Sequence, residues 1–323
     1  SDIRNIVLFV FMLVKMQMVI VIIQFSYLLM TKGVGFHSDD IYGTFSDANI
    51  LGYTVGMVLI VSIVFRYLNS EINNSWRLHL NKQILMCATI IMLSEARAAI
   101  LTLIILAIAS LILFQELRTL ISRKILYIMS GLALLSITFS LAMGSGSLTN
   151  NNITRLFSIS QFMEIEQNAA SGAGRFLWYP ITFEDLNNYS RNPAFGFGPS
   201  NHSSFGAFFL DTSINRTLVY NRFRQKDLGL DAGVDSQIIP IWAEYGYVGL
   251  FLFFGIYFKL IYSFYRKYLK TNYGFMKTVY LLGFLITAYF VILTYASQIW
   301  QSPPFTLLYY SLISIIYKYE LFN

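Results

Sequence analysis

Residues 50–68, ILGYTVGMVLIVSIVFRYL, form an apolar run in which Arg66 is the only charged residue. A helix rises 1.5 Å per residue, so about 20 apolar residues cross the hydrocarbon core of a bilayer. Similar runs lie near 6–31, 83–95, 98–115, 125–143, 236–261, 277–296 and 305–319. The sequence therefore predicts an all-α polytopic membrane protein with about eight transmembrane helices.

The composition of the whole chain agrees with this prediction. Of the 323 residues, 56% are apolar and 12% are charged, whereas a typical soluble domain has about 25% charged residues. In a membrane protein, the net charge of +6 is typical of basic cytoplasmic loops and anionic lipid or phosphate partners, and we expect no nucleic-acid partner. Cys87 is the single cysteine, which excludes an internal disulfide or a cysteine cluster for zinc.

Basic residues in the short loops indicate how the chain lies in the membrane. They gather on one side of the predicted bundle, where Arg66, Lys82, Arg123 and Lys267 are examples. This asymmetry places both termini in the cytoplasm. We therefore expect three parts: transmembrane helices 1–5 in 1–143, a large periplasmic loop in 144–235, and transmembrane helices 6–8 in 236–323.

Two short helices are predicted in the large loop. The first begins near Arg155 and runs to about Ile165, with apolar residues at the helical spacing of a surface-lying helix. The second begins after Gly174. Asn192 and Pro193 should end it, because the residue before proline is disfavoured in the α region.

Two external arginines are candidates for binding an anion. Arg97 lies in a tight turn between two predicted helices, next to Ala96 and Ala98, and its planar guanidinium suits a phosphate group. Arg175 opens the second loop helix, where free backbone N–H groups also favour an anion. The alternatives are a lipid-headgroup anchor for Arg97 and an ordinary loop position for Arg175.

Two carboxylates near the sixth predicted span are candidates for acid–base chemistry. Asp235 lies where the loop meets the span, and Glu244 follows nine residues later. A carboxylate inside a span is energetically costly, so it is a functional candidate by default. The alternatives are a helix cap for Asp235 and a structural ion pair with Lys15 for Glu244.

Further loop residues are candidates for substrate binding. Gly196 and Gly198 follow Pro193, which implies unusual backbone angles or a close approach to a ligand. Arg222 and Arg224 form a basic patch that would attract an anionic lipid-linked substrate, or simply a solvated basic face.

Two ring side chains complete the candidate binding set. His202 suits acid–base work, or it serves only as a hydrogen-bonding loop residue. Trp178 is placed to stack on a sugar or to anchor in the membrane interface.

In this order the motifs resemble the O-antigen polymerase and O-antigen ligase superfamily, bacterial inner-membrane glycosyltransferases with a GT-C-like helical fold. The similarity covers about residues 43–260. It rests on a Gly-Asn element (43–52), a turn (Glu95–Ala98), a Gly-Arg…Trp run (Gly174–Trp178), a Pro…Gly-x-Gly motif (Pro193–Gly198) and a Glu-x-Gly-x-x-Gly-Leu helix (Glu244–Leu250).

The resemblance implies glycosyl transfer between undecaprenyl-diphosphate-linked oligosaccharides at the periplasmic face of the inner membrane. Arg97 and Arg175 would stabilise the leaving diphosphate, because the external loop has no Asp-x-Asp motif for a metal. Asp235 would be the base, with Glu244 as second candidate. We expect no cofactor and no metal. The expected partners are the lipid-linked oligosaccharide and membrane lipids, and a chain-length regulator is a further candidate.

Position 235 bears on the choice between the two branches of the superfamily. Ligases have a histidine nine residues before the glutamate, where this chain has Asp235, which favours a polymerase. The alternatives are a ligase that moves the glycan to lipid A core or to protein, and a lipid-linked saccharide transporter or flippase. The superfamily commonly has more spans than the eight predicted, so we expect further helices before Ser1.

Overall fold

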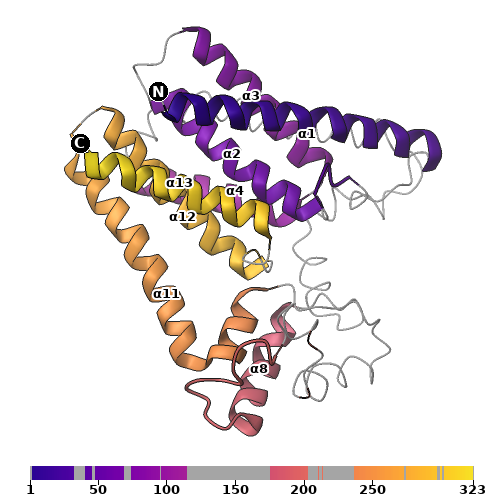
Figure 1. The fold of residues 1–323 in the computed structure, drawn as a ribbon, viewed down its shortest axis with the longest axis vertical. Helices are drawn as coiled ribbons and strands as arrows, with labels where there is room; N and C mark the ends of the chain where they lie inside the picture. The colour runs from indigo at the N-terminus through magenta and orange to yellow at the C-terminus, as the bar shows by residue number, and fades with distance from the viewer. Residues whose placement is uncertain are drawn as a thin grey trace. The chain divides into compact units, whose positions relative to one another are not determined.

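The structure, a computed structural model, describes residues 2–32, 41–45, 48–68, 74–94, 96–114, 175–202, 210, 213, 236–272, 274–296, 299 and 302–322. In these ranges the regular secondary structure is helical throughout. The helices are α1 (Asp2–Lys32), α2 (Ala48–Leu68), α3 (Asn74–Leu93), α4 (Arg97–Leu113), α8 (Arg175–Tyr189), α11 (Ile238–Lys270), α12 (Phe275–Ala296) and α13 (Pro303–Phe322), shown in Figure 1.

Among the described residues, four helices are long and apolar enough to cross a membrane. They are Val10–Thr31, Ala48–Arg66, Ile238–Lys270 and Phe275–Tyr295, and Ala98–Leu113 is a shorter apolar helix. The prediction of an all-α polytopic membrane protein is confirmed. The predicted span at 125–143 and the surface helix from Arg155 lie outside the described residues.

Helix α3 begins at Asn74, nine residues before the apolar run at 83–95 from which a span is predicted. Its first half is polar, but Leu80, Gln83 and Cys87 recur at helical spacing and are all buried. One face of the polar half therefore packs inward, and the helix extends beyond the part that hydropathy detects.

The described residues fall into two compact units. The first combines α1–α4 with Ile261–Phe290 and the chain from Leu307. In it α2 packs against α3 and α4, and α1 packs against α3 (Figure 1). Its core includes the fully buried side chains of Val21, Leu51 and Ile90.

Two glycines four residues apart allow α2 to pack closely. A Cβ atom on Gly52 would lie 2.0 Å from the Cβ of Ala96, at the start of α4. A Cβ atom on Gly56 would lie 2.1 Å from the hydroxyl of Tyr289, and this hydroxyl donates to the Tyr53 carbonyl at 3.2 Å. In lipid the hydrophobic effect does not drive helices together, so their association depends on close packing. Small residues at this spacing permit that packing because they let the two backbones approach each other.

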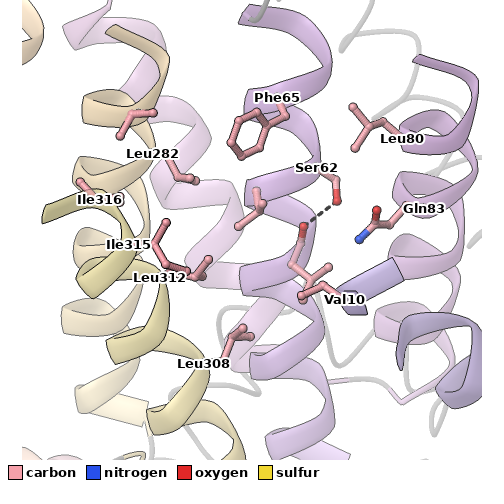
Figure 2. A pocket seen from close by; sticks show the side chains of 13 residues that line it. Val10, Ser62, Phe65, Leu80, Gln83, Leu282, Leu308, Leu312, Ile315 and Ile316 are labelled. Atoms are coloured by element: carbon pink, nitrogen blue, oxygen red, sulfur yellow. Dashed lines mark hydrogen bonds between the residues drawn. The ribbon is translucent and has the colours of Figure 1, made fainter. Parts of the chain in front are cut away.

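The first unit also encloses a largely apolar cavity, shown in Figure 2. Phe65, Leu282 and Leu312 are among the residues that line it, and Ser62 and Gln83 are its polar ones. The Ser62 hydroxyl donates to the Val58 carbonyl of its own helix at 2.7 Å. None of the residues that line it is charged, so this cavity offers no group for acid–base chemistry or for binding an anion.

Substitution of Gly52 tests the close packing of α2. Gly52→Ala should lower the thermal unfolding midpoint in detergent, because the new methyl group collides with Ala96, and overpacking costs about 1–3 kcal/mol. Gly255→Ala is the matched control, since nothing lies within 4 Å of a Cβ there. It should gain up to about 1 kcal/mol of helix propensity. An unchanged midpoint for Gly52→Ala would show that α2 and α4 do not touch at this point.

Candidate functional site

The second unit contains α8, the loop that follows it, α11 as far as Leu260, and Val291–Thr306. Helix α8 begins at Arg175 and ends at Tyr189, in agreement with the predicted helix between Gly174 and Pro193. The chain then folds onto the beginning of α11, where the bend in α11 is visible in Figure 1. We refer to residues 193–202 as the clamp loop.

Helix α11 is interrupted at Gly246, whose φ of 66° and ψ of −163° are not helical. In an unbroken helix, the carbonyls of Ala243 and Glu244 would accept hydrogen bonds from the N–H groups four residues later. Here they accept instead from the N–H groups of Phe197 and Gly198 in the clamp loop, each at 2.9 Å. The break therefore turns two helical carbonyls into anchors for the loop.

The N–H groups on the other side of the break are satisfied by the same loop. Tyr247 N–H donates to the Pro193 carbonyl at 3.3 Å, and Val248 N–H donates to the Ala194 carbonyl at 3.0 Å. Two helical hydrogen bonds are thus exchanged for four bonds to the loop. An interrupted helix usually leaves backbone groups without hydrogen-bond partners. Here the two carbonyls and the two N–H groups at the break are all paired with the loop.

Glycine is required on both sides of this contact. Gly196 has a φ of 74°, and a Cβ atom on it would lie 2.4 Å from the Ala243 carbonyl oxygen. A Cβ atom on Gly246 would lie 2.4 Å from the Ala194 carbonyl oxygen. Gly198 also has a positive φ, of 89°. The unusual angles predicted for the glycine pair are therefore present, and the backbone that approaches Gly196 closely is that of α11.

The carboxylate of Glu244 adds two further bonds to the clamp loop. The side chain is buried, and it accepts hydrogen bonds from Ser200 N–H at 2.9 Å and from His202 N–H at 3.2 Å. Bonds of this kind to an ionised carboxylate are stronger than neutral ones. The described partners of the Glu244 carboxylate are thus backbone N–H groups, whereas the sequence suggested Lys15 as an ion-pair partner. The Lys15 ammonium lies 4.5 Å from the centroid of the Phe11 ring.

The imidazole of His202 joins the clamp loop to α8. Its Nε2 lies 3.2 Å from Oδ2 of Asp185, and both side chains are completely buried. The Phe197 ring stacks on the imidazole at a centroid distance of 5.2 Å and an angle of 7°. Asp185 is not among the site residues predicted from the sequence. The structure identifies it, because this charged residue is buried with Thr182 and Leu186 on one face of α8.

A family model described as O-antigen ligase matches residues 84–254 of the chain. The chain belongs to the O-antigen ligase family. The matched region runs from α3 into α11 and includes the clamp loop and the helix break. No curated protein matches the sequence. Membership places this multi-pass membrane protein among glycosyltransferase-like enzymes, polymerases and ligases that act with lipid-linked oligosaccharides and membrane lipids.

In this member of the O-antigen ligase family, the structure brings together part of the predicted set. Gly196, Gly198, His202 and Glu244 all take part in the clamp between the loop and α11. Within the described ranges, no three His, Cys, Asp or Glu side chains gather as a metal site would require.

The remaining predicted residues belong to parts of the chain that are described incompletely. Arg97 begins α4 and Arg175 begins α8, but their side chains, like that of Trp178, lie outside the described set. Asp235, Arg222 and Arg224 lie outside the described residues altogether. The functional roles predicted for all of these residues stay predictions.

The role of Glu244 as a loop anchor is tested by Glu244→Gln. The amide has one accepting oxygen, and its NH2 group would face a backbone N–H. One loop donor would then lose its acceptor, at a cost of about 1–3 kcal/mol. We expect a lower unfolding midpoint and faster proteolysis within 193–202. The control is Glu184→Gln, because Glu184 is exposed on α8. A fully stable but inactive Glu244→Gln protein would instead assign Glu244 to acid–base chemistry.

Proposed function

We propose that this protein polymerises an O-antigen or related surface polysaccharide at the periplasmic face of the inner membrane. It would join oligosaccharide repeat units that are linked to undecaprenyl diphosphate. The observation that carries the proposal is membership of the O-antigen ligase family across residues 84–254. Asp235, at the position where ligases have histidine, supports a polymerase over a ligase.

The proposed reaction is a glycosyl transfer without a metal. A hydroxyl of the acceptor glycan attacks the anomeric carbon of the donor glycan and loses its proton to a base. The bond from that carbon to the phosphate oxygen breaks, and the lipid diphosphate leaves with the electron pair. The protein must therefore supply positive charge for the diphosphate and a base for the hydroxyl.

Arg97 and Arg175 are the proposed ligands of the diphosphate. Each is the first residue of a helix, α4 and α8 respectively, where unpaired N–H groups and the helix dipole also favour an anion. At α4 the preceding residue, Ala96, makes no side-chain capping bond. Ala96 therefore leaves the N–H groups of this helix end open to an anion, which is consistent with the proposed role of Arg97.

Asp235 is the proposed base for the acceptor hydroxyl. It directly precedes Ser236 and Gln237, which lead into α11. Glu244, the second candidate, is less suited, because both of its carboxylate oxygens already accept backbone N–H groups. The proposal therefore separates the roles of the two carboxylates, with Asp235 in chemistry and Glu244 in the architecture of the loop.

A ligase is the second candidate function, because the family model that matches the chain is described as O-antigen ligase. The two functions are separated by adding purified protein in nanodiscs to the lipid-linked repeat unit, with and without lipid A core. A ladder of longer glycans on lipid diphosphate without lipid A core supports the polymerase. Transfer that occurs only onto lipid A core would establish a ligase. Movement of intact lipid between leaflets without either product would establish a transporter.

The proposed arginine ligands are tested in the same assay. Arg97→Ala and Arg175→Ala should each lower the rate of ladder formation about 10²–10³-fold, the usual effect of losing one electrostatic stabiliser. Lysine at either position should also be poor, since a point charge cannot chelate two phosphate oxygens. Arg191→Ala is the control, because Arg191 is exposed between α8 and the clamp loop. Activity should survive EDTA. Near-normal ladders from both alanine variants would remove the arginines from the mechanism.

A further inference from the structure

Two buried polar atoms on one side of α8 have no hydrogen-bond partner in the described part of the chain. They are Oγ1 of Thr182 and Nδ1 of His202, and both residues are fully buried. Thr182 and Asp185 are three residues apart, so they share a helix face. Asp185 contacts His202 through Nε2, which brings the imidazole to that same face. Buried polar atoms nearly always have a partner, so each of these two atoms is a candidate contact for a ligand.

The chemistry of the two atoms selects the kind of ligand. In the tautomer that donates Nε2–H to the Asp185 carboxylate, Nδ1 of His202 carries a lone pair and accepts. The Thr182 hydroxyl can donate and accept. A phosphate oxygen would be repelled by the Nδ1 lone pair, since both are acceptors. A sugar hydroxyl suits either atom, because it can donate to Nδ1 and can donate to or accept from the Thr182 hydroxyl.

The same mixture of donors and acceptors continues on α11 and just before it. Oε1 of Gln237, an acceptor, and Nε1 of Trp242, a donor, are also buried without a partner in the described residues. The Trp242 ring lies 6.3 Å from that of Phe183, the residue after Thr182. Aromatic rings beside unpaired donors and acceptors favour a polyhydroxylated ligand over a simple anion.

We propose that Thr182 and His202 form a subsite for a sugar hydroxyl of the lipid-linked oligosaccharide. Asp185 is a positioning residue that holds the imidazole with Nδ1 toward the hydroxyl, and the stacked Phe197 ring fixes the plane of the imidazole. The inference rests on the proposed function for the identity of the glycan. It adds Thr182 and Asp185 to the binding residues and states which group of the substrate His202 contacts.

Two variants are designed to remove the candidate ligand-binding atoms with little change in the shape of the side chain. Thr182→Val keeps the shape of the side chain and deletes the hydroxyl. His202→Gln keeps an amide N–H that reaches Asp185 and deletes Nδ1. The control is Thr287→Val, a fully buried threonine whose hydroxyl donates to the Gly283 carbonyl at 2.7 Å.

The measurement is the affinity of each purified protein, in nanodiscs, for two probes. One is the undecaprenyl-diphosphate-linked repeat unit that accumulates in producing cells lacking this protein, and the other is undecaprenyl diphosphate without a glycan. Both subsite variants should bind the glycan-bearing lipid about tenfold more weakly, the effect of losing one hydrogen bond. They should bind the glycan-free lipid like the wild type. Thr287→Val should bind both probes normally.

Three outcomes would overturn the subsite. Wild-type affinity of both variants for the glycan-bearing lipid would show that no hydroxyl binds there. Equal weakening for both probes would show that the lost contact is not to a sugar. A clearly lower unfolding midpoint for Thr182→Val would show that its hydroxyl is bonded within the fold. A wild-type protein that binds the glycan-bearing lipid but forms no ladder would refute the polymerase and leave the subsite standing.

Discussion

The interruption of α11 at Gly246 is the constraint on which the candidate site depends. A helix that breaks in a buried place normally leaves backbone groups without partners. Here the two open carbonyls and the two open N–H groups are all bonded to one loop, so the break is stabilised by the contact it creates. The contact tolerates no side chain at Gly196 or Gly246, because each would press a Cβ atom against the opposite backbone.

This contact also fixes the positions of the neighbouring residues. Glu244 holds Gly198 through its carbonyl and holds Ser200 and His202 through its carboxylate. The imidazole of His202 is then directed at Asp185 on α8. A binding group gains affinity when its position is fixed before the ligand arrives, and the clamp loop fixes His202 by its backbone and by its side chain. The chemistry of such a site would therefore depend on residues such as Glu244 that hold the binding groups in place.

Much of the fold is predictable from the sequence, because a membrane span needs a long apolar run and α1, α2, α11 and α12 contain one. Hydropathy does not predict the beginning of α3, because this half of the helix is polar and only the spacing of its buried residues marks it as helical. The end of α8 before Pro193 was predicted from a local steric rule. The orientation in the membrane, the division into three parts and the role of Asp235 stay predictions.

The candidate site was predictable only in part, for a physical reason. Gly196 and Gly198 indicate unusual backbone angles from the local sequence alone. Their contact with α11 near Gly246 cannot be predicted locally, because it forms only when the loop folds onto that helix. The sequence makes Glu244 an acid–base candidate or an ion-pair partner, since it does not show the backbone N–H groups that converge on the carboxylate. Asp185 has no motif around it, and its contact with His202 depends on the same folding of the loop.

The clamp itself is tested most directly by amide hydrogen exchange of the full-length protein in nanodiscs. An irregular loop on a protein surface exchanges its amide hydrogens rapidly, whereas amides that donate stable hydrogen bonds are protected. The structure predicts protection, comparable to that within α11, at six amides outside regular helical bonding: Phe197, Gly198, Ser200, His202, Tyr247 and Val248. Rapid exchange at these six positions, with protection confined to the regular turns of α8 and α11, would contradict the account.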